Sequence, residues 1–437
     1  MPDLLAARLQ MAVSLGFHIV FAVIGMAMPV MMVAAEYRHA KTGDAVYLDL
    51  AHRWAKGTAI LFAVGAVSGT VLSFELGLLW PRFMERAGPL IGMPFSLEGF
   101  AFFLEAIFLG VYLYGWERVS QRAHLVAGVV VAVSGLASGV FVVAVNAWMN
   151  TPAGFVVKDG ELVELDLVRA FFSPSFPAEA MHMVLAAYAA VAFAVLGIHA
   201  AALLRTPKSV FHRRAGAIAL GLATVAIPLQ LFSGDFAAKN IAKYQPVKLA
   251  AAEAHFETTA DAPIVLGGIA DTEHREVHGA LRIPYVLSFL AKGDPHATVT
   301  GLDSVAETNW PPVAVTHLAF DAMVGSGMCM LGLVAFALFE RVRKRDPFDS
   351  RAFLRGAVVV APLGLVAIEA GWTVTEVGRQ PWIIGGVLRT ADAVTPVPHL
   401  LIPFATFTAV YVMLGVVVLV LLRRHVGSVP HDAEGPA

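Results

Sequence analysis

The sequence predicts an all-α integral membrane protein with nine transmembrane helices. Of its 437 residues, 58% are hydrophobic and only 15% are charged, whereas soluble domains carry roughly 25% charged residues. Mean hydropathy is +0.71. A helix that crosses a bilayer needs about 20 mostly apolar residues, and nine stretches of this chain meet that requirement. Because nine is odd, the two termini are expected on opposite sides of the membrane.

Hydropathy sets the limits of the spans and divides the chain into four parts. The first apolar run is too long for a signal peptide, so it is expected to remain as the first span. Residues 1–234 hold six spans, 235–312 form a long polar loop without a span, 313–425 hold three spans, and 426–437 form a tail. The predicted spans cover about 10–35, 55–79, 96–116, 124–146, 180–204, 215–233, 313–339, 353–374 and 400–422.

Basic residues predict the orientation. Loops 36–56, 205–214 and 340–352 are rich in Lys and Arg, whereas the intervening loops are poorer in bases. Basic loops stay on the cytoplasmic side. The N-terminus and the 235–312 loop are therefore expected outside, and the C-terminal tail inside. Loops this long are usually functional or disordered.

Charge and cysteine content exclude several classes of function. A net charge of −2 lacks the basic footprint of a nucleic-acid-binding protein. The single cysteine, Cys329, excludes an internal disulfide framework, covalent haem attachment through CxxCH, a CxxC zinc site and a cysteine-ligated iron–sulfur cluster. Any metal must be held by His, Met or carboxylate side chains, or arrive inside a cofactor.

Two pairs of acidic residues lie in or beside the predicted spans. Glu98 and Glu105 are seven residues apart, as are Glu369 and Glu376, so each pair lies within about 20° on one helix face. A single acid could be satisfied by neighbouring helices. Facing acids favour proton transfer, because carboxylates in series can pass protons.

Histidines inside the spans are the second chemical signal. A lone histidine is more often hydrogen-bonded to a backbone carbonyl than bound to a metal. His18 and His182, however, fall in the outer halves of their spans with Glu98 and Glu369, and Met323 falls near them. Such a set suits haem iron. A zinc site is the competing interpretation, but HExxH spacing is absent. Two further histidines in spans are His199 and His317.

Six motifs follow one another along the chain and surround the residues named above: "RLQMAVSLGFHIVF", "FSLEGFAFFLEAIF", "FPAEAMHMVLAAY", "QPVKLAAAEAHFET", "FDAMVG" and "EAGWTVTEVGRQPW". In this order they resemble subunit I of cytochrome bd-type quinol oxidases, and the resemblance covers nearly the whole sequence. It implies a haem-containing subunit of a bacterial terminal oxidase in the cytoplasmic (inner) membrane, which oxidises quinol at the outer face and reduces O2 to water. Such an enzyme contributes to the proton motive force without pumping.

The resemblance also implies cofactors, partners and haem ligands. The cofactors are two haem b groups, one low-spin and one high-spin, and one haem d. The partners are quinol, O2, a second membrane subunit and small accessory subunits. His182 and Met323 correspond to the axial ligands of the low-spin haem b. His18 and Glu369 correspond to the ligands of the two high-spin haems; His18 is preferred for haem d, and the reverse assignment stays open.

Proton-transfer and quinol-binding roles follow from the same resemblance. Glu98 and Glu105 would line the haem pair and pass protons to it. Lys248 and Glu253 match the quinol-binding pair of the long outer loop. Five residues apart on an Ala-rich helix, they would point about 140° from each other, which favours two separate contacts to a quinol head group over a direct ion pair.

The motif "GRQPW" at 378–382 provides a candidate for holding a haem propionate. Arg379 lies ten residues after Glu369, at the outer end of its span. Arginine forms bidentate bonds to carboxylates, so we expect Arg379 to bind a propionate. Trp382 is expected to anchor at the interface. A plain belt of aromatic and basic residues is the alternative.

One position departs from the family pattern. The family carries an arginine two residues before the methionine ligand, and Asp321 stands there in this sequence. His317 lies four residues earlier, on the same helix face, so the two can pair. We expect a protonated His317 to restore part of the missing positive charge.

Two other functions are compatible with parts of the sequence. One is a membrane haem b protein that passes electrons between quinone and a partner without reducing oxygen. The other is a proton-coupled transporter that uses Glu98, Glu105 and Glu369. The sequence shows neither an inverted repeat nor a pair of broken helices in matching halves, which transporters of that kind often carry.

Overall fold

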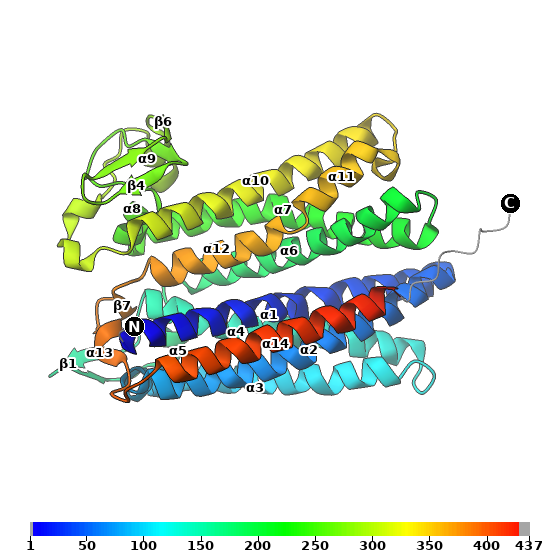
Figure 1. Cartoon of the computed structure of the whole chain (residues 1–437), viewed down its shortest axis with the longest axis horizontal. Helices are drawn as coiled ribbons and strands as arrows, with labels where there is room; N and C mark the ends of the chain where they lie inside the picture. Colours follow the sequence, from blue (N-terminus) through cyan, green and yellow to red (C-terminus); the bar gives the residue numbers. More distant parts are fainter. Residues whose placement is uncertain (1–2, 428–437) are drawn as a thin grey trace.

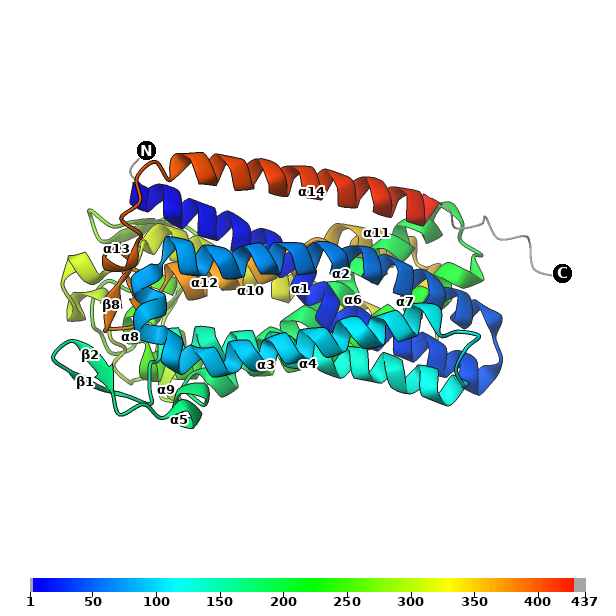
Figure 2. The same ribbon diagram turned by 90° about the horizontal axis from the view of Figure 1, so that it is seen from below.

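The computed structural model describes residues 3–427 and consists mainly of long helices (Figures 1 and 2). Within these residues, nine helical segments are long and apolar enough to cross a membrane, which confirms the predicted number. The start of α1 and the end of α14 lie at opposite ends of the bundle. We name these ends the N-terminal side and the C-terminal side. The spanning helices are α1 (Asp3–Thr42), α2 (Ala45–Leu79), α3 (Pro81–Tyr114), α4 (Gln121–Asn150), α6 (Phe176–Arg205), α7 (Val210–Tyr244), α10 (Val313–Val342), α11 (Arg351–Val360) with α12 (Leu363–Val377), and α14 (Leu401–Gly427).

Most of these helices are longer than the predicted spans. Hydropathy detects only the apolar part of a helix, whereas backbone hydrogen bonds continue into polar sequence where a cap supports them. Asp44, for example, caps α2 by accepting from the Val46 N–H at 3.0 Å. The largest difference is at α7, which continues to Tyr244, so the long loop begins there and not at 235. Helix α14 likewise runs past 425, and 428–437 of the predicted tail lie outside the described residues.

The eighth span is two helices and not the single predicted helix. Helix α11 ends at Val360 and α12 begins at Leu363, because Pro362 lacks a backbone N–H and its ring crowds the preceding turn. Small residues let this break pack tightly against α6. A Cβ on Gly197 would lie only 2.2 Å from the Ala361 Cβ, so glycine is required at that position.

The long loop is ordered and has its own small core. It contains two antiparallel pairs, β3–β6 and β4–β5, and a cluster of buried apolar residues that includes Phe256, Val265 and Leu302. Its elements are α8 (Pro246–Ala252), β3 (Ile264–Leu266), β4 (Ile269–Asp271), β5 (Glu276–His278), β6 (Leu281–Ile283), α9 (Val286–Lys292) and two short 3-10 turns at Leu302–Ser304 and Glu307–Asn309. In Figure 1 this loop covers part of the N-terminal side.

Shorter elements complete the connections at the ends of the bundle. Two hairpins and two small helices lie on the N-terminal side, and one 3-10 turn precedes α11. They are β1 (Val156–Lys158) with β2 (Glu161–Val163), α5 (Leu167–Phe171), β7 (Trp382–Ile384) with β8 (Leu388–Arg389), α13 (Thr390–Ala393) and the turn Pro347–Asp349.

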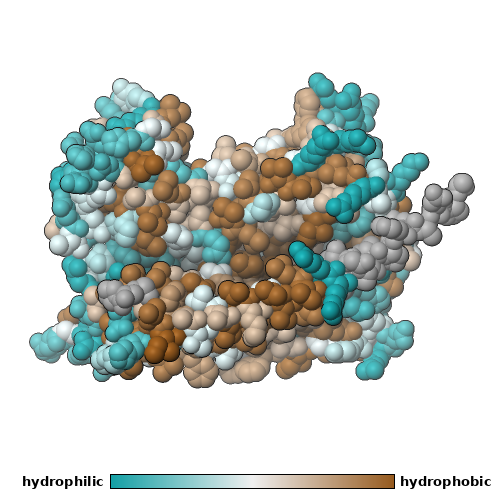
Figure 3. All heavy atoms as spheres, viewed as in Figure 1, coloured by the Kyte–Doolittle hydropathy of each residue, from teal (hydrophilic) through white to brown (hydrophobic). Residues whose placement is uncertain are grey.

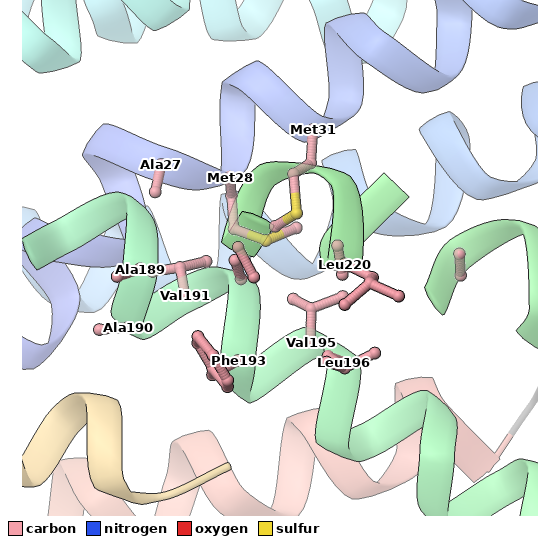
Figure 4. Close-up of a cluster of buried hydrophobic side chains, with 14 of the residues drawn as sticks. Ala27, Met28, Met31, Ala189, Ala190, Val191, Phe193, Val195, Leu196 and Leu220 are labelled. Atoms are coloured by element: carbon pink, nitrogen blue, oxygen red, sulfur yellow. The ribbon is translucent and has the colours of Figure 1, made fainter. Parts of the chain in front are cut away.

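The centre of the bundle is an apolar contact between α1, α6 and α7. Figure 4 shows buried side chains of this cluster from all three helices, among them Met28 and Met31 of α1, Phe193 and Leu196 of α6 and Leu220 of α7. Alanines on α6 allow the helices to approach closely. The outer surface carries a hydrophobic band between two hydrophilic ends (Figure 3), as a membrane-spanning bundle requires.

Candidate functional site

Helix α12 brings two of the predicted haem ligands next to other helices. Glu369 faces α1, where a Cβ on Gly16 would lie 3.2 Å from the Glu369 Oε2 atom. Two residues later, a Cβ on Gly371 would lie 3.1 Å from the Met323 Sδ atom of α10. The glycines therefore leave room for a carboxylate and a thioether within one turn of α12. The sequence could not show that α12 packs against both α1 and α10.

His18 lies on α1, two residues beyond Gly16, and faces α2. Its Nδ1 atom is 3.0 Å from the Ser68 Oγ atom. A Cβ on Gly69 would lie 2.9 Å from the ring, so only glycine fits against this imidazole. The serine and the glycine together fix the ring plane, as supporting residues do around metal-ligating histidines.

His182 lies near the start of α6 and faces α7. Its Nδ1 atom is 3.0 Å from the Ser233 Oγ atom. The Gln230 amide nitrogen lies 3.1 Å from His182 Nε2. The same amide nitrogen lies 3.2 Å from Nδ1, so Gln230 packs against the ring between its two nitrogens.

The chemistry of these side chains suits haem iron. The Glu369 Oε1 atom is buried and has no hydrogen-bond partner within the described residues, and a buried unpaired acceptor is costly unless a cation or donor meets it. Residues 3–427 contain no group of three His, Cys, Asp or Glu that could hold a metal ion by themselves. Haem iron needs only one or two protein ligands, so separated His, Met and Glu side chains fit it.

The two acids of α3 face α4 and α1. Glu98 accepts a hydrogen bond from the Ser138 hydroxyl at 3.1 Å. A Cβ on Gly135 would lie 3.0 Å from the Glu105 Oε1 atom, and one on Gly25 would lie 3.6 Å from it. Glu105 is therefore enclosed between three helices, about 10 Å further along α3 than Glu98 and nearer the C-terminal side.

A third polar group continues this line and was not predicted. Tyr112 lies on α3, seven residues after Glu105, with its hydroxyl buried and close to the Glu36 carboxylate. Beside it, the His124 Nδ1 atom is 2.9 Å from a Glu36 carboxylate oxygen. The spacing of seven from Glu105 to Tyr112 was the available signal, because three polar residues at this interval share one face.

A buried polar network joins the long loop to the GRQPW motif. The Lys248 ammonium donates to the Asn150 side-chain oxygen at 2.8 Å, and the Arg379 guanidinium donates to the same oxygen at 3.1 Å. Arg379 also pairs with Glu376 at 2.5 Å, and the Asn150 amide donates to Glu179 at 3.0 Å. Two cations and two carboxylates thus surround one asparagine of α4.

Lys248 and Glu253 do not form an ion pair with each other within the described residues. Helix α8 ends at Ala252, so Glu253 follows the helix and is not part of it. Burial lowers the pKa of Lys248 to about 7, an effect that nearby Glu179 opposes. Burial raises the pKa of Glu253 to about 8, while the Val265 N–H opposes the shift and Asp321 adds to it. Its Oε2 atom is buried without a partner within the described residues.

The rest of GRQPW has two different environments. Trp382 is half-buried in β7, with the Arg389 guanidinium 4.9 Å from its ring centre. Gln380 accepts a hydrogen bond from Arg8 of α1 at 3.1 Å. Arg8 was missed at the sequence level, although its position ten residues before His18 on the same helix was a usable signal.

His317 lies beneath the long loop and is completely buried. Its Nδ1 atom is 2.8 Å from the Ala252 carbonyl oxygen, and its Nε2 atom is 3.2 Å from the Gly267 carbonyl oxygen. The predicted contact with Asp321 is present at 3.4 Å, and Asp321 also accepts from the Gly267 N–H at 3.0 Å. Each ring nitrogen of His317 thus faces a backbone carbonyl oxygen, which can only accept a hydrogen bond.

Comparison with known proteins identifies the family. Residues 6–430 match the family model described as cytochrome bd terminal oxidase subunit I. The chain belongs to this family. Its members are quinol:oxygen oxidoreductases, so the chain is a subunit of a cytochrome bd quinol oxidase. The family relies on haem cofactors and quinol, and the nine apolar helices agree with its place in a membrane.

Individual relatives match over nearly the whole chain. The structure of bd oxidase from Geobacillus thermodenitrificans has a TM-score of 0.92, with 39% identity over 98% of this chain and 99% of that chain. A Bacillus subtilis protein with the provisional name cytochrome bd menaquinol oxidase subunit I is 38% identical over 99% of both chains. The cytochrome bd ubiquinol oxidase subunit 1 of the same organism is 30% identical over 98% of this chain and 94% of its own.

Proposed function

We propose that this chain is the haem-carrying subunit of a terminal oxidase that oxidises quinol at the N-terminal side, on the outer face of the bacterial cytoplasmic membrane, and reduces O2 to water. The supporting observation is the buried, unpartnered carboxylate oxygen of Glu369, which faces Gly16 of α1. The Met323 thioether packs one half-turn away against Gly371. A buried acceptor and a thioether beside one broken helix suit iron ligation better than packing alone.

Four side chains are proposed as haem ligands. His182 and Met323 would hold a low-spin haem b, and His18 and Glu369 would hold a high-spin haem b and a haem d, with His18 on haem d. When bound, the haems supply one-electron transfer and oxygen reduction. Arg379 is proposed to bind a propionate. Its Nε atom is buried without a partner within the described residues, which leaves one donor for an anionic oxygen.

The quinol head group is proposed to lie between Lys248 and Glu253. Glu253 is neutral at pH 7 because burial favours its protonated form. Glu253 can accept a proton from quinol only after it has released its own proton. Its Oε2 atom has no hydrogen-bond partner among the described residues and is available for this exchange. Lys248 is a hydrogen-bond donor whose ammonium is held by the Asn150 side-chain oxygen. The two residues thus supply one donor and one acceptor for a quinol hydroxyl.

Protons for water are proposed to come from the C-terminal side. Tyr112, Glu105 and Glu98 follow one face of α3, at intervals of about 10 Å, and water would bridge those gaps. Quinol protons leave at the N-terminal side, so the reaction separates charge across the membrane without pumping. A second membrane subunit and small accessory subunits complete the proposed enzyme.

His317 is proposed to carry the positive charge that Asp321 removes from the family pattern. Its two carbonyl contacts support the imidazolium form. Because Ala252 and Gly267 both belong to the long loop, the same contacts hold this loop against α10 near Met323. His317 would thus carry a positive charge and fix the long loop to α10 between the proposed quinol site and Met323.

The test of the proposed function is optical spectroscopy on the purified enzyme with extraction of its haems. We expect a reduced-minus-oxidised spectrum with haem b bands and a red-shifted haem d band, and oxygen uptake on addition of quinol. A spectrum with haem b alone and no oxygen uptake would indicate the electron-transfer protein. Purified protein without Soret absorbance would indicate the transporter.

A further inference from the structure

A cavity on the C-terminal side is lined by basic residues that the redox chemistry does not use. It has a volume of about 730 Å³ and opens between the start of α7 and the turn after α10. Five bases and one acid line it, together with Val210, Ala217, Pro347 and Phe348; the charged residues are Arg213, Arg214, Arg341, Lys344, Arg345 and Asp346. We name it the basic pocket.

Two of these bases are fixed by carboxylates and form the walls. Arg213 bonds to Asp346 at 3.2 Å and to Asp349 at 2.5 Å. Arg214 lies 3.5 Å from Asp44 of the turn between α1 and α2. The ion pairs hold the α7 and α10 sides of the pocket in one arrangement, so the cavity does not depend on flexible side chains alone.

The other three bases have no such partner. Arg341, Lys344 and Arg345 are exposed, and no carboxylate within residues 3–427 pairs with them. The positive-inside rule explains bases in this loop, but it requires neither a cavity nor convergence of two segments about 130 residues apart. Three unpaired cations around a concave site attract an anion with several oxygens, such as a phosphate group.

The surroundings favour a phosphate carried by a lipid. Val342, next to Arg341, is 82% exposed, and Phe339 is half-exposed one turn further into α10. Val210 is exposed at the rim on α7. Exposed apolar side chains of α7 and α10 therefore lie beside the cations of the pocket, which provides apolar surface for acyl chains and positive charge for a head group.

We infer that the basic pocket binds the phosphate head group of an anionic phospholipid. This site is separate from the proposed haem and quinol sites, and it does not depend on the proposed function. It would hold the α6–α7 and α10–α11 connections against each other at the membrane surface.

The test titrates the delipidated, detergent-solubilised oxidase complex with phosphatidylglycerol and measures bound lipid by native mass spectrometry. The variant Arg341→Gln/Lys344→Gln/Arg345→Gln should bind one molecule about a hundredfold more weakly than the wild type, at about 1 kcal/mol per lost cation. The variant Arg38→Gln/Lys41→Gln/Arg122→Gln removes equal charge from exposed positions at the same end and should bind as the wild type.

Two further measurements distinguish a lipid phosphate from free phosphate, and loss of the site from misfolding of the variant. Phosphatidylcholine should bind more weakly than phosphatidylglycerol, and inorganic phosphate should not saturate the pocket. The charge-retaining variant Arg341→Lys/Arg345→Lys should keep the lipid. Equal loss in both glutamine variants, loss in the lysine variant, or saturation by inorganic phosphate without displacement by lipid would overturn the inference.

Discussion

The two ends of the bundle carry their charges in different ways. On the N-terminal side, Lys248 and Arg379 are buried with Glu179 and Glu376 around one asparagine. On the C-terminal side, Arg341, Lys344 and Arg345 of a short loop are exposed, and the five bases of the basic pocket outnumber its one acid. Burying an ion costs several kcal/mol unless a partner compensates it, whereas water stabilises an exposed one. Paired buried charges therefore indicate a site for chemistry, and unpaired exposed charges indicate orientation and lipid contact.

The largest expected effect distinguishes two histidines of α6, one near each end of the helix. We expect His182→Ala to lose the low-spin haem b spectrum and to lower quinol oxidation by at least about a hundredfold, since even supporting residues of metal sites cost 10–100-fold. His199 is buried and contacts His212 at 2.9 Å. The control His199→Asn should keep all haem bands in reduced-minus-oxidised spectra. Retention of the full spectrum by His182→Ala would remove His182 from the ligand set.

A second test compares a buried lysine with an exposed one. Lys248→Gln removes the ammonium that donates to the Asn150 side-chain oxygen at 2.8 Å, and a hydrogen bond from a charged group contributes about 1.5–3 kcal/mol. We expect a lower thermal unfolding temperature and a KM for quinol raised more than about tenfold. Lys239 forms an exposed pair with Asp235 at 2.6 Å, so Lys239→Gln should change stability by less than about 1 kcal/mol. Equal effects of both substitutions would contradict the role of the buried network.

The pH dependence of quinol oxidation tests whether Glu253 accepts a proton from quinol. Burial raises the pKa of this carboxyl to about 8, so the proton-accepting carboxylate increases as pH rises from 6 to 8 and is scarce below that range. The ratio of wild-type to Glu253→Gln activity should therefore increase most steeply below about pH 8 and level off at higher pH. Glu257 is exposed in the same loop, and Glu257→Gln should give a constant ratio. A constant ratio for Glu253→Gln as well would exclude proton transfer at this residue.

The smallest expected effect concerns the charge beside Met323. Replacing Asp321 with Arg removes a negative charge and adds a positive one, which disfavours the ferric state. The midpoint potential of the low-spin haem should rise by on the order of 50–100 mV, corresponding to about 1–2 kcal/mol at an effective dielectric constant of about 20. Asp321→Asn should give about half that shift in a redox titration. An unchanged potential in both variants would show that the haem does not sense this position.

Several features of this protein were predictable because their signals are local. Hydropathy identifies each span from its own residues, which is why the number of spans is correct while the helix ends are not. Pro362 could have predicted the break between α11 and α12, but a proline within an apolar run is tolerated in many membrane helices. The single cysteine likewise excludes from composition alone the sites that need several thiolates.

The tertiary structure alone decided which of these side chains meet. Asn150 carried no signal in the sequence, yet it joins Lys248 of the long loop to Arg379 beyond α12. The order of the 245–312 loop likewise depends on its own apolar core and on His317, which binds two of its carbonyl groups. Hydropathy and motif spacing describe one segment at a time, whereas a buried polar network requires that segments distant in sequence satisfy one another's charges and hydrogen bonds. That mutual satisfaction is a property of packing.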